Sequence, residues 1–179
     1  RLHFCVSFAT DHDHPDDTGC DECIDLLFEA TELYGAGFLA GFSLRDSRQF
    51  DEWQTLQSEI CSREVISAYQ MLVSSLYAKS DYEQALVCTE NWINLDPLNE
   101  FAHRQLMVLQ AESGRRSDAL RQYGKLKNLL ESELQVSPDE ETRRLFSSLK
   151  ESRNSVSKND VSIASFANNL PAQPTPFIG

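Results

Sequence analysis

One stretch of this chain, residues 66 to 131, aligns with itself when it is shifted by 34 residues. The aligned positions are Leu72 and Leu106, Ser80 and Gly114, Ala85–Leu86 and Ala119–Leu120, and Thr89 and Tyr123. A period of about 34 residues is expected of a repeated helix–turn–helix unit. In such a unit a small residue such as Ala85 or Ala119 lets the two helices approach closely, and a glycine or small polar residue forms the turn.

The repeat limits the fold, because one helical hairpin cannot bury its own apolar face and must stack on neighbours. Pro97 closes the first repeat, whereas Glu131 stands at the equivalent position of the second, so only the first copy is close to the tetratricopeptide pattern. We therefore predict an all-α protein, a tetratricopeptide-like helix–turn–helix repeat stack forming a right-handed α–α superhelix of about six helices. Such a stack is a scaffold for contacts with other proteins.

Apolar spacing and turn signals place six helices, approximately over residues 19–34, 48–79, 80–95, 97–113, 117–134 and 137–152. Residues 1–10 mix aromatic and β-favouring side chains, so we expect either one short strand or the tail of a preceding domain. Residues 35–47 hold three glycines among apolar side chains. We expect the aromatic rings of this segment to pin it against the core.

Polar residues and prolines predict where these helices begin. The predicted caps are Thr18 with Asp21, Asp46 or Ser47, Ser80 with Glu83, Asp96 before Pro97, and Ser137 before Pro138. The long helix over residues 48–79 has an apolar stripe that we expect to be buried. The stripe consists of Trp53, Leu56, Ile60, Tyr69, Leu72 and Leu76.

The formal net charge of −12 would repel a phosphate backbone, so the chain is a poor candidate for nucleic-acid binding. No apolar run approaches the roughly 18 residues of a membrane span, and no basic-then-apolar leader opens the chain. Five cysteines, an odd number, favour a reducing, cytoplasmic setting over a disulfide framework. Because the chain begins at Arg1 and ends abruptly at Gly179, we expect a fragment of a longer protein.

Five ordered segments carry a more specific signal. They are FLAGFSLRDS-x2-FDEWQ (Phe38 to Gln54), SDYEQAL (Ser80 to Leu86), LDPLNEFAHRQLM (Leu95 to Met107), SGRRSDALRQY (Ser113 to Tyr123) and ELQVSPDEETRRLF (Glu133 to Phe146). Together they resemble the bacterial transcriptional activator domain of the antibiotic-regulatory type of bacterial transcription regulators, over roughly residues 24 to 150. The resemblance implies a tetratricopeptide-like regulatory domain that follows a winged-helix DNA-binding domain and that in some members helps dimerisation or contacts other regulator domains.

The same resemblance implies a division of the chain into three parts. Residues 1–19 are the tail of an upstream segment and an acidic His-containing loop, residues 20–152 are the activator domain, and residues 153–179 are a flexible linker toward a downstream ATPase domain. The sequence contains no phosphate-binding loop of the form G-x-x-x-x-G-K-[ST]. DNA binding and ATP hydrolysis are therefore implied for the parent protein and not for this chain.

The sharpest local motif is His12-x-His14-x5-Cys20-x2-Cys23. Two histidines two residues apart in an extended segment point to the same side, and two cysteines three apart in a helix share one face. Two imidazoles and two thiolates make a tetrahedral, structural zinc site, so we predict one structural zinc ion here. Nearby carboxylates raise the local affinity for cations without selecting zinc; they belong to Asp11, Asp13, Asp16 and Asp17.

Two other interpretations of the motif stay open. It is a polar loop with two helix-packing cysteines, or Cys20 and Cys23 form a redox couple, although such a couple normally accompanies a βαβ context. Cys5, Cys61 and Cys88 are interpreted as packing residues.

Candidate partner-binding residues on the concave side of the stack are Asn91, His103, Arg104 and Tyr123. Positive charge gathers on the second repeat, at Arg104, Arg115, Arg116, Arg121, Lys125 and Lys127. These cations form either a solvated face or a surface for charge-guided docking onto a partner domain or a second copy. His103 lies within a predicted helix, where a packing role is the simpler interpretation.

These observations predict a regulatory, protein-interaction module of a bacterial transcription regulator. Its expected partners are other domains of the same regulator and a second protomer, with no nucleic acid and no membrane. The alternative is a stand-alone tetratricopeptide adaptor that binds a peptide. We expect no enzyme, because no catalytic motif stands out and four good zinc ligands leave no open coordination position.

Overall fold

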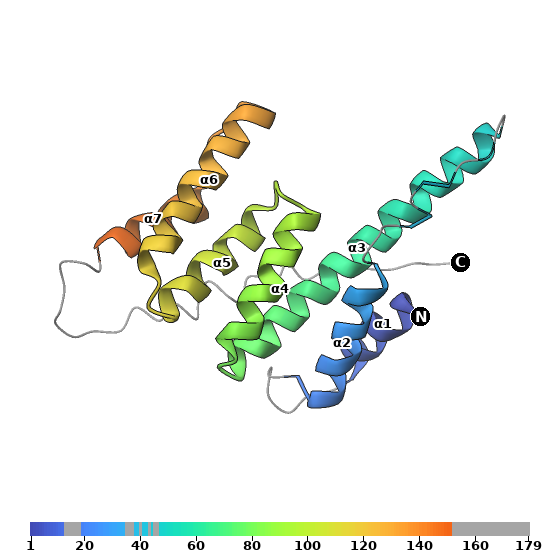
Figure 1. Ribbon diagram of the computed structural model, residues 1–179, viewed down its shortest axis with the longest axis horizontal. Helices are drawn as coiled ribbons and strands as arrows, with labels where there is room; N and C mark the ends of the chain where they lie inside the picture. The colour runs from blue at the N-terminus through green and yellow to red at the C-terminus, as the bar shows by residue number, and fades with distance from the viewer. Residues whose placement is uncertain (13–18, 35–37, 40, 43, 45–46, 152–179) are drawn as a thin grey trace.

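A computed structural model describes residues 1–12, 19–34, 38–39, 41–42, 44 and 47–151 of the chain (Figure 1). Within these residues the chain forms seven α-helices and no strand. The helices are α1 (Leu2–Asp11), α2 (Asp21–Leu33), α3 (Arg48–Ala78), α4 (Tyr82–Leu95), α5 (Glu100–Glu112), α6 (Arg116–Leu134) and α7 (Glu140–Glu151). None of these helices combines the length and the apolar character that crossing a membrane requires.

The helices form a stack in which each one packs against the next along the chain. Helix α1 also packs against α3, and α5 packs against α7. Figure 1 shows α1 and α2 at one end of the stack and α6 and α7 at the other. The predicted all-α helix–turn–helix repeat stack is confirmed.

The 34-residue period is visible in the helix bounds. Helix α3 ends at Ala78 and α5 ends 34 residues later at Glu112, while α4 and α6 begin with the same offset. The turns between these helices contain Ser80 at φ 60° and Gly114 at φ 74°, so the left-handed conformation recurs at equivalent positions. Ala85 and Ala119 are fully buried, which is expected where two helices of one repeat approach closely.

The buried residues form two clusters. The larger one joins α1 to α5 and includes Leu72 of α3, which is fully buried. The smaller one lies among α5, α6 and α7, and its buried members are Met107, Val108, Ala119, Leu145 and Leu149. The stack is therefore closed at both ends by helices outside the repeat.

Residues Leu2–Asp11 are helical, so the strand, one of the two predicted alternatives for residues 1–10, is wrong. Helix α1 buries Cys5, Val6 and Ala9, whose spacing places them on one helical face toward α2 and α3. The β-favouring composition of the segment is thus outweighed by tertiary packing, because propensity is a weak prior beside a buried face.

Three predicted helix starts are displaced by one to three residues. Asp81, and not Ser80, caps α4 by accepting a hydrogen bond from the Gln84 amide at 3.2 Å. The cap of α5 is Asn99, which accepts from the amide of Ala102 at 3.1 Å, whereas Asp96 follows the end of α4. Both errors arise because several polar residues in succession compete for one capping position.

The cap of α7 is also displaced. Asp139, two residues beyond the predicted Ser137, accepts a hydrogen bond from the amide of Thr142 at 2.6 Å. Ser47 precedes α3 as predicted but makes no side-chain cap bond. The predicted caps Thr18 and Asp46 lie outside the described residues, as do residues 152–179.

Helix α3 has two unlike halves, and its N-terminal half projects beyond the other helices (Figure 1). Its first buried residue is Val65, so we call residues 48–64 the arm. Of the stripe predicted to be buried, Leu72 and Leu76 are buried, whereas Trp53 and Leu56 on the arm are 46% and 52% exposed. That part of the prediction is wrong, because a helical period identifies an apolar stripe but not whether a neighbour covers it.

The described residues 38, 39 and 42 of the segment before α3 lie along the arm. The rings of Phe38 and Trp53 lie 5.7 Å apart between centroids, and those of Phe42 and Phe50 lie 5.6 Å apart. The side-chain amide of Gln54 donates to the carbonyls of residues 39 and 42 at 3.1 and 3.2 Å. The aromatic rings thus hold the described part of this segment, as predicted, but their support is an exposed helix.

Candidate functional site

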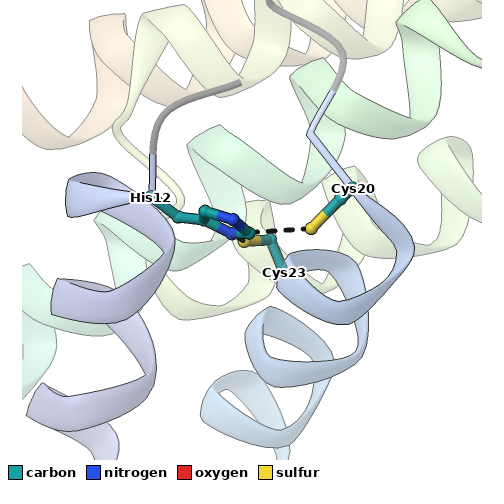
Figure 2. Close-up of side chains that lie close together, drawn as sticks. All are labelled: His12, Cys20 and Cys23. Carbon is teal, nitrogen blue, oxygen red and sulfur yellow. Dashed lines mark hydrogen bonds between the residues drawn. The ribbon is translucent and has the colours of Figure 1, made fainter. Parts of the chain in front are cut away.

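Three side chains predicted to bind a metal come together between the end of α1 and the start of α2 (Figure 2). Nδ1 of His12 lies 3.2 Å from Sγ of Cys23 and 3.6 Å from Sγ of Cys20. One ligand atom from each of the three residues lies within 4.8 Å of the other two. This group could hold a metal ion. His14 lies outside the described residues, so its role as fourth ligand stays a prediction.

Helix ends position this group. His12 is the C-cap of α1; its backbone amide donates to the carbonyl of Phe8 at 3.0 Å, and its ring lies 5.3 Å from the Phe8 ring. Cys20 is the N-cap of α2, and Cys23 lies in the first turn of that helix. Because α1 and α2 pack against each other, the imidazole faces the two sulfur atoms.

Gly19 fixes the direction from which the chain enters α2. Its φ of 51° lies in the left-handed region, and a Cβ built there would lie 2.5 Å from Oγ of Ser75 on α3. Both the conformation and the close approach require glycine at this position. The sequence alone did not identify this role of Gly19, because its proximity to Ser75 is a tertiary feature.

The three side chains differ in exposure and in protonation. His12 is exposed, Cys20 is half-buried and Cys23 is buried. Burial, followed by the hydrogen bond with Cys20, raises the pKa of the Cys23 thiol to about 11. A cation that binds here must therefore displace a thiol proton, as is usual for sulfur ligands.

The remaining cysteines agree with the predicted packing role to different degrees. Cys5 and Cys88 are buried, whereas Cys61 is half-buried, and the structure has all five cysteines as free thiols. Burial raises the pKa of Cys88 to about 11, so this thiol is protonated and unreactive at neutral pH.

Of the candidate partner-binding residues, Asn91 is exposed on α4 and His103 is buried in α5. Nε2 of His103 donates to the carbonyl of Pro97 at 2.9 Å, and Nδ1 accepts from the side-chain amide of Gln122 at 2.7 Å. Burial lowers the pKa of His103 despite the Pro97 contact, so the imidazole is neutral near pH 7. The packing role predicted for His103 is confirmed, and the residue is not accessible on a surface.

The other two candidates are engaged within the stack. Arg104, with a side chain 12% exposed, binds Oδ2 of Asp139 at 2.6 Å and Oε2 of Glu141 at 3.0 Å. Tyr123 stacks on Phe146 of α7 with the ring centroids 4.0 Å apart. The four residues therefore do not make one open surface, and the role predicted for the exposed Asn91 stays a prediction.

Some residues of the predicted basic face form salt bridges within the stack, and others are exposed. Arg104 joins α5 to the start of α7, and Arg121 pairs with Asp118 on its own helix. Arg115, Lys125 and Lys127 are exposed and have no salt bridge among the described residues. Charge-guided docking through this face stays a prediction.

A surface that the sequence did not identify lies on the arm and the segment beside it. Five large apolar side chains are between 39% and 52% exposed there: Leu39, Phe42, Leu44, Trp53 and Leu56. We call these five residues the arm patch. Large apolar side chains that are exposed together on a folded protein commonly mark a protein-interaction site. The apolar motif FLAGFSLRDS-x2-FDEWQ was visible in the sequence, but the sequence alone suggested that it was buried.

Comparison with known proteins identifies a family. The family described as bacterial transcriptional activator domain matches residues 9–150, which is most of the chain. This match confirms the resemblance seen in the sequence over residues 24 to 150. No curated protein and no solved structure matches significantly. The matched range contains both the His12, Cys20 and Cys23 group and the arm patch.

Proposed function

The chain belongs to the bacterial transcriptional activator domain family, a family of tetratricopeptide-like regulatory domains, and from this membership we propose that it is a protein-interaction module of a bacterial transcription regulator. The module contacts other domains of the same regulator and a second protomer in the cytoplasm. DNA binding and ATP hydrolysis belong to flanking domains of the parent protein. The module itself has no catalytic role.

The arm patch is the observation that supports this proposal. Trp53 on the projecting helix and Phe42 on the segment beside it expose about half of their surface, and they remain in water at a cost of roughly 25 cal/mol for each Å² of apolar area. A partner that covers them recovers this free energy, and tryptophan is enriched among the residues that dominate binding energies. The patch therefore has the chemistry of an interface centre.

The arm presents this patch in a fixed arrangement. Trp53 is flanked by the rings of Phe38 and Phe50, and Gln54 holds the backbone of the preceding segment. An ion pair between Arg48 and Glu52, which lie four residues apart, adds a small stabilisation to the first turns of α3. Because these side chains are already held in place before binding, the module itself loses little conformational entropy when a partner docks on them.

A photoreactive amino acid placed at position 53 is expected to cross-link the intact regulator to another of its domains or to a second protomer. The same amino acid at position 87 is the control, because Val87 is also about half exposed but lies on α4, away from the arm. Cross-linked peptides are identified by mass spectrometry. We expect no such cross-link from position 87, because only position 53 lies in the proposed interface.

The paired substitution Trp53→Gln/Leu56→Gln tests the same interface by removing the apolar side chains of the patch. Glutamine favours helix, so the arm keeps its conformation while the patch loses its apolar area. We expect the contact captured from a photoreactive group at position 52 to disappear in this variant and to persist in Val87→Gln/Leu134→Gln. An intact regulator that forms no cross-link from positions 52 or 53 contradicts the proposed role of the arm.

A further inference from the structure

Two helix ends meet at His12, Cys20 and Cys23 with the spacing that ligands of one ion adopt. Zinc–sulfur bonds of about 2.3 Å and zinc–nitrogen bonds of about 2.0 Å separate a nitrogen and a sulfur ligand by about 3.5 Å around a tetrahedral ion. The two nitrogen–sulfur separations in this group are 3.2 and 3.6 Å. The ligand atoms are thus close to the positions that they would take around a zinc ion, and only small side-chain adjustments are needed to reach those positions.

The donor atoms select the ion. Two sulfurs and one imidazole nitrogen suit zinc, whereas calcium and magnesium require oxygen ligands. Among the described residues the group contains no carboxylate. Three protein ligands are enough to hold zinc, because water or another side chain completes the tetrahedron.

The local structure also restrains the imidazole and one thiol. The Phe8 ring lies beside the His12 ring, and Cys23 is 2% exposed, so neither side chain is free to sample many rotamers. Gly19 brings the chain close to Ser75, which orients the backbone immediately before Cys20. Ligands that are held in this way lose little entropy when the ion binds.

We propose that His12, Cys20 and Cys23 bind one zinc ion that fastens the end of α1 to the start of α2. Helix α1 has ten residues, which is too short for stability on its own, and it buries only Cys5, Val6 and Ala9. An ion that connects the two helix ends shortens the effective loop between them and keeps α1 in the stack. This inference does not depend on the arm.

The direct test is the zinc content of the tag-free chain, loaded with zinc under reducing conditions and then freed of unbound metal by gel filtration. We expect about one zinc ion per chain in the wild type, as for a single structural site. The same content is expected in the control Cys61→Ser, whose thiol lies away from the group. Cys20→Ser/Cys23→Ser should hold less than about a tenth of that amount, because both thiolate ligands are lost.

A second measurement covers the case in which the double cysteine variant does not fold. His12 is exposed, so His12→Ala keeps the packed core and should still lose most of the zinc. In the wild type, a chelator should speed hydrogen exchange of the α1 amides, and added zinc should reverse this change. The proposal is overturned if the wild-type chain contains no zinc or if His12→Ala holds as much zinc as the wild type. It is also overturned if the chelator leaves the hydrogen exchange of the α1 amides unchanged.

Discussion

Replacing Leu72 with alanine is expected to lower the free energy of unfolding by about 2–5 kcal/mol. Leu72 is fully buried on α3 within the cluster that joins α1 to α5, so its removal leaves a cavity lined by several helices. Urea unfolding followed by circular dichroism measures the change. The loss reflects both the transfer of the missing methyl groups and the cavity that remains.

Leu56→Ala is the matched control, since it makes the same change on the same helix. Leu56 is 52% exposed on the arm, so we expect its substitution to change the free energy of unfolding by no more than about 0.5 kcal/mol. A similar large loss for both variants would mean that the arm is packed in the isolated chain. That result would remove the basis for the arm patch as a free surface.

Replacing Ala119 with leucine is expected to lower the free energy of unfolding by about 1–3 kcal/mol. Ala119 is fully buried in the cluster that contains Met107 and Val108 of α5, where a larger side chain pushes α5 and α6 apart. Thermal unfolding measures the effect, because each kcal/mol lowers the Tm of a domain of this size by about 2–4 °C.

Ala78→Leu provides the comparison for this overpacking. Ala78 is the exposed last residue of α3, so leucine adds a side chain there without displacing a neighbour, and we expect little change in Tm. If Ala119→Leu left the Tm unchanged, this result would contradict the close helix approach that the repeat predicts. Ala85→Leu should behave like Ala119→Leu, because Ala85 is the equivalent and equally buried residue of the first repeat.

The repeat could be predicted because its determinants are local. A left-handed turn at Ser80 and Gly114 and small residues at Ala85 and Ala119 recur at a fixed offset, and each acts within one hairpin. Capping was less predictable, since neighbouring polar residues compete for one position and tertiary packing decides between them. The choice of Asn99 over Asp96 at the start of α5 is an example.

Part of the candidate metal site could also be predicted, because ligand spacing is a property of the sequence. Cys20 and Cys23 share one face of the first turn of α2 for the reason expected, and His12 lies opposite them. What brings His12 there is the α1 helix, where the sequence predicted a strand or the tail of a preceding domain. The contact of Gly19 likewise depends on Ser75 of α3, which lies more than fifty residues away in the chain.

Exposure was the least predictable property. Trp53, Leu56 and Ile60 on the arm have the same three- and four-residue spacing as Tyr69, Leu72 and Leu76 in the core half of α3, so Trp53 and Leu72 look alike in the sequence. His103 shows the opposite case, since a polar side chain named as a candidate surface residue is buried and its ring is bonded to Pro97 and Gln122 within the stack. Neither outcome follows from residue type without the tertiary contacts.

The most direct test of the arm patch as the regulatory contact surface is genome-wide transcript abundance in strains carrying variants of the gene. Trp53→Gln/Leu56→Gln should reproduce the transcript changes of a deletion strain while the regulator accumulates to its normal level. Val87→Gln/Leu134→Gln, which alters equally exposed residues elsewhere, should match the wild type. Transcripts that respond to the deletion but are unchanged in the arm variant would contradict this role.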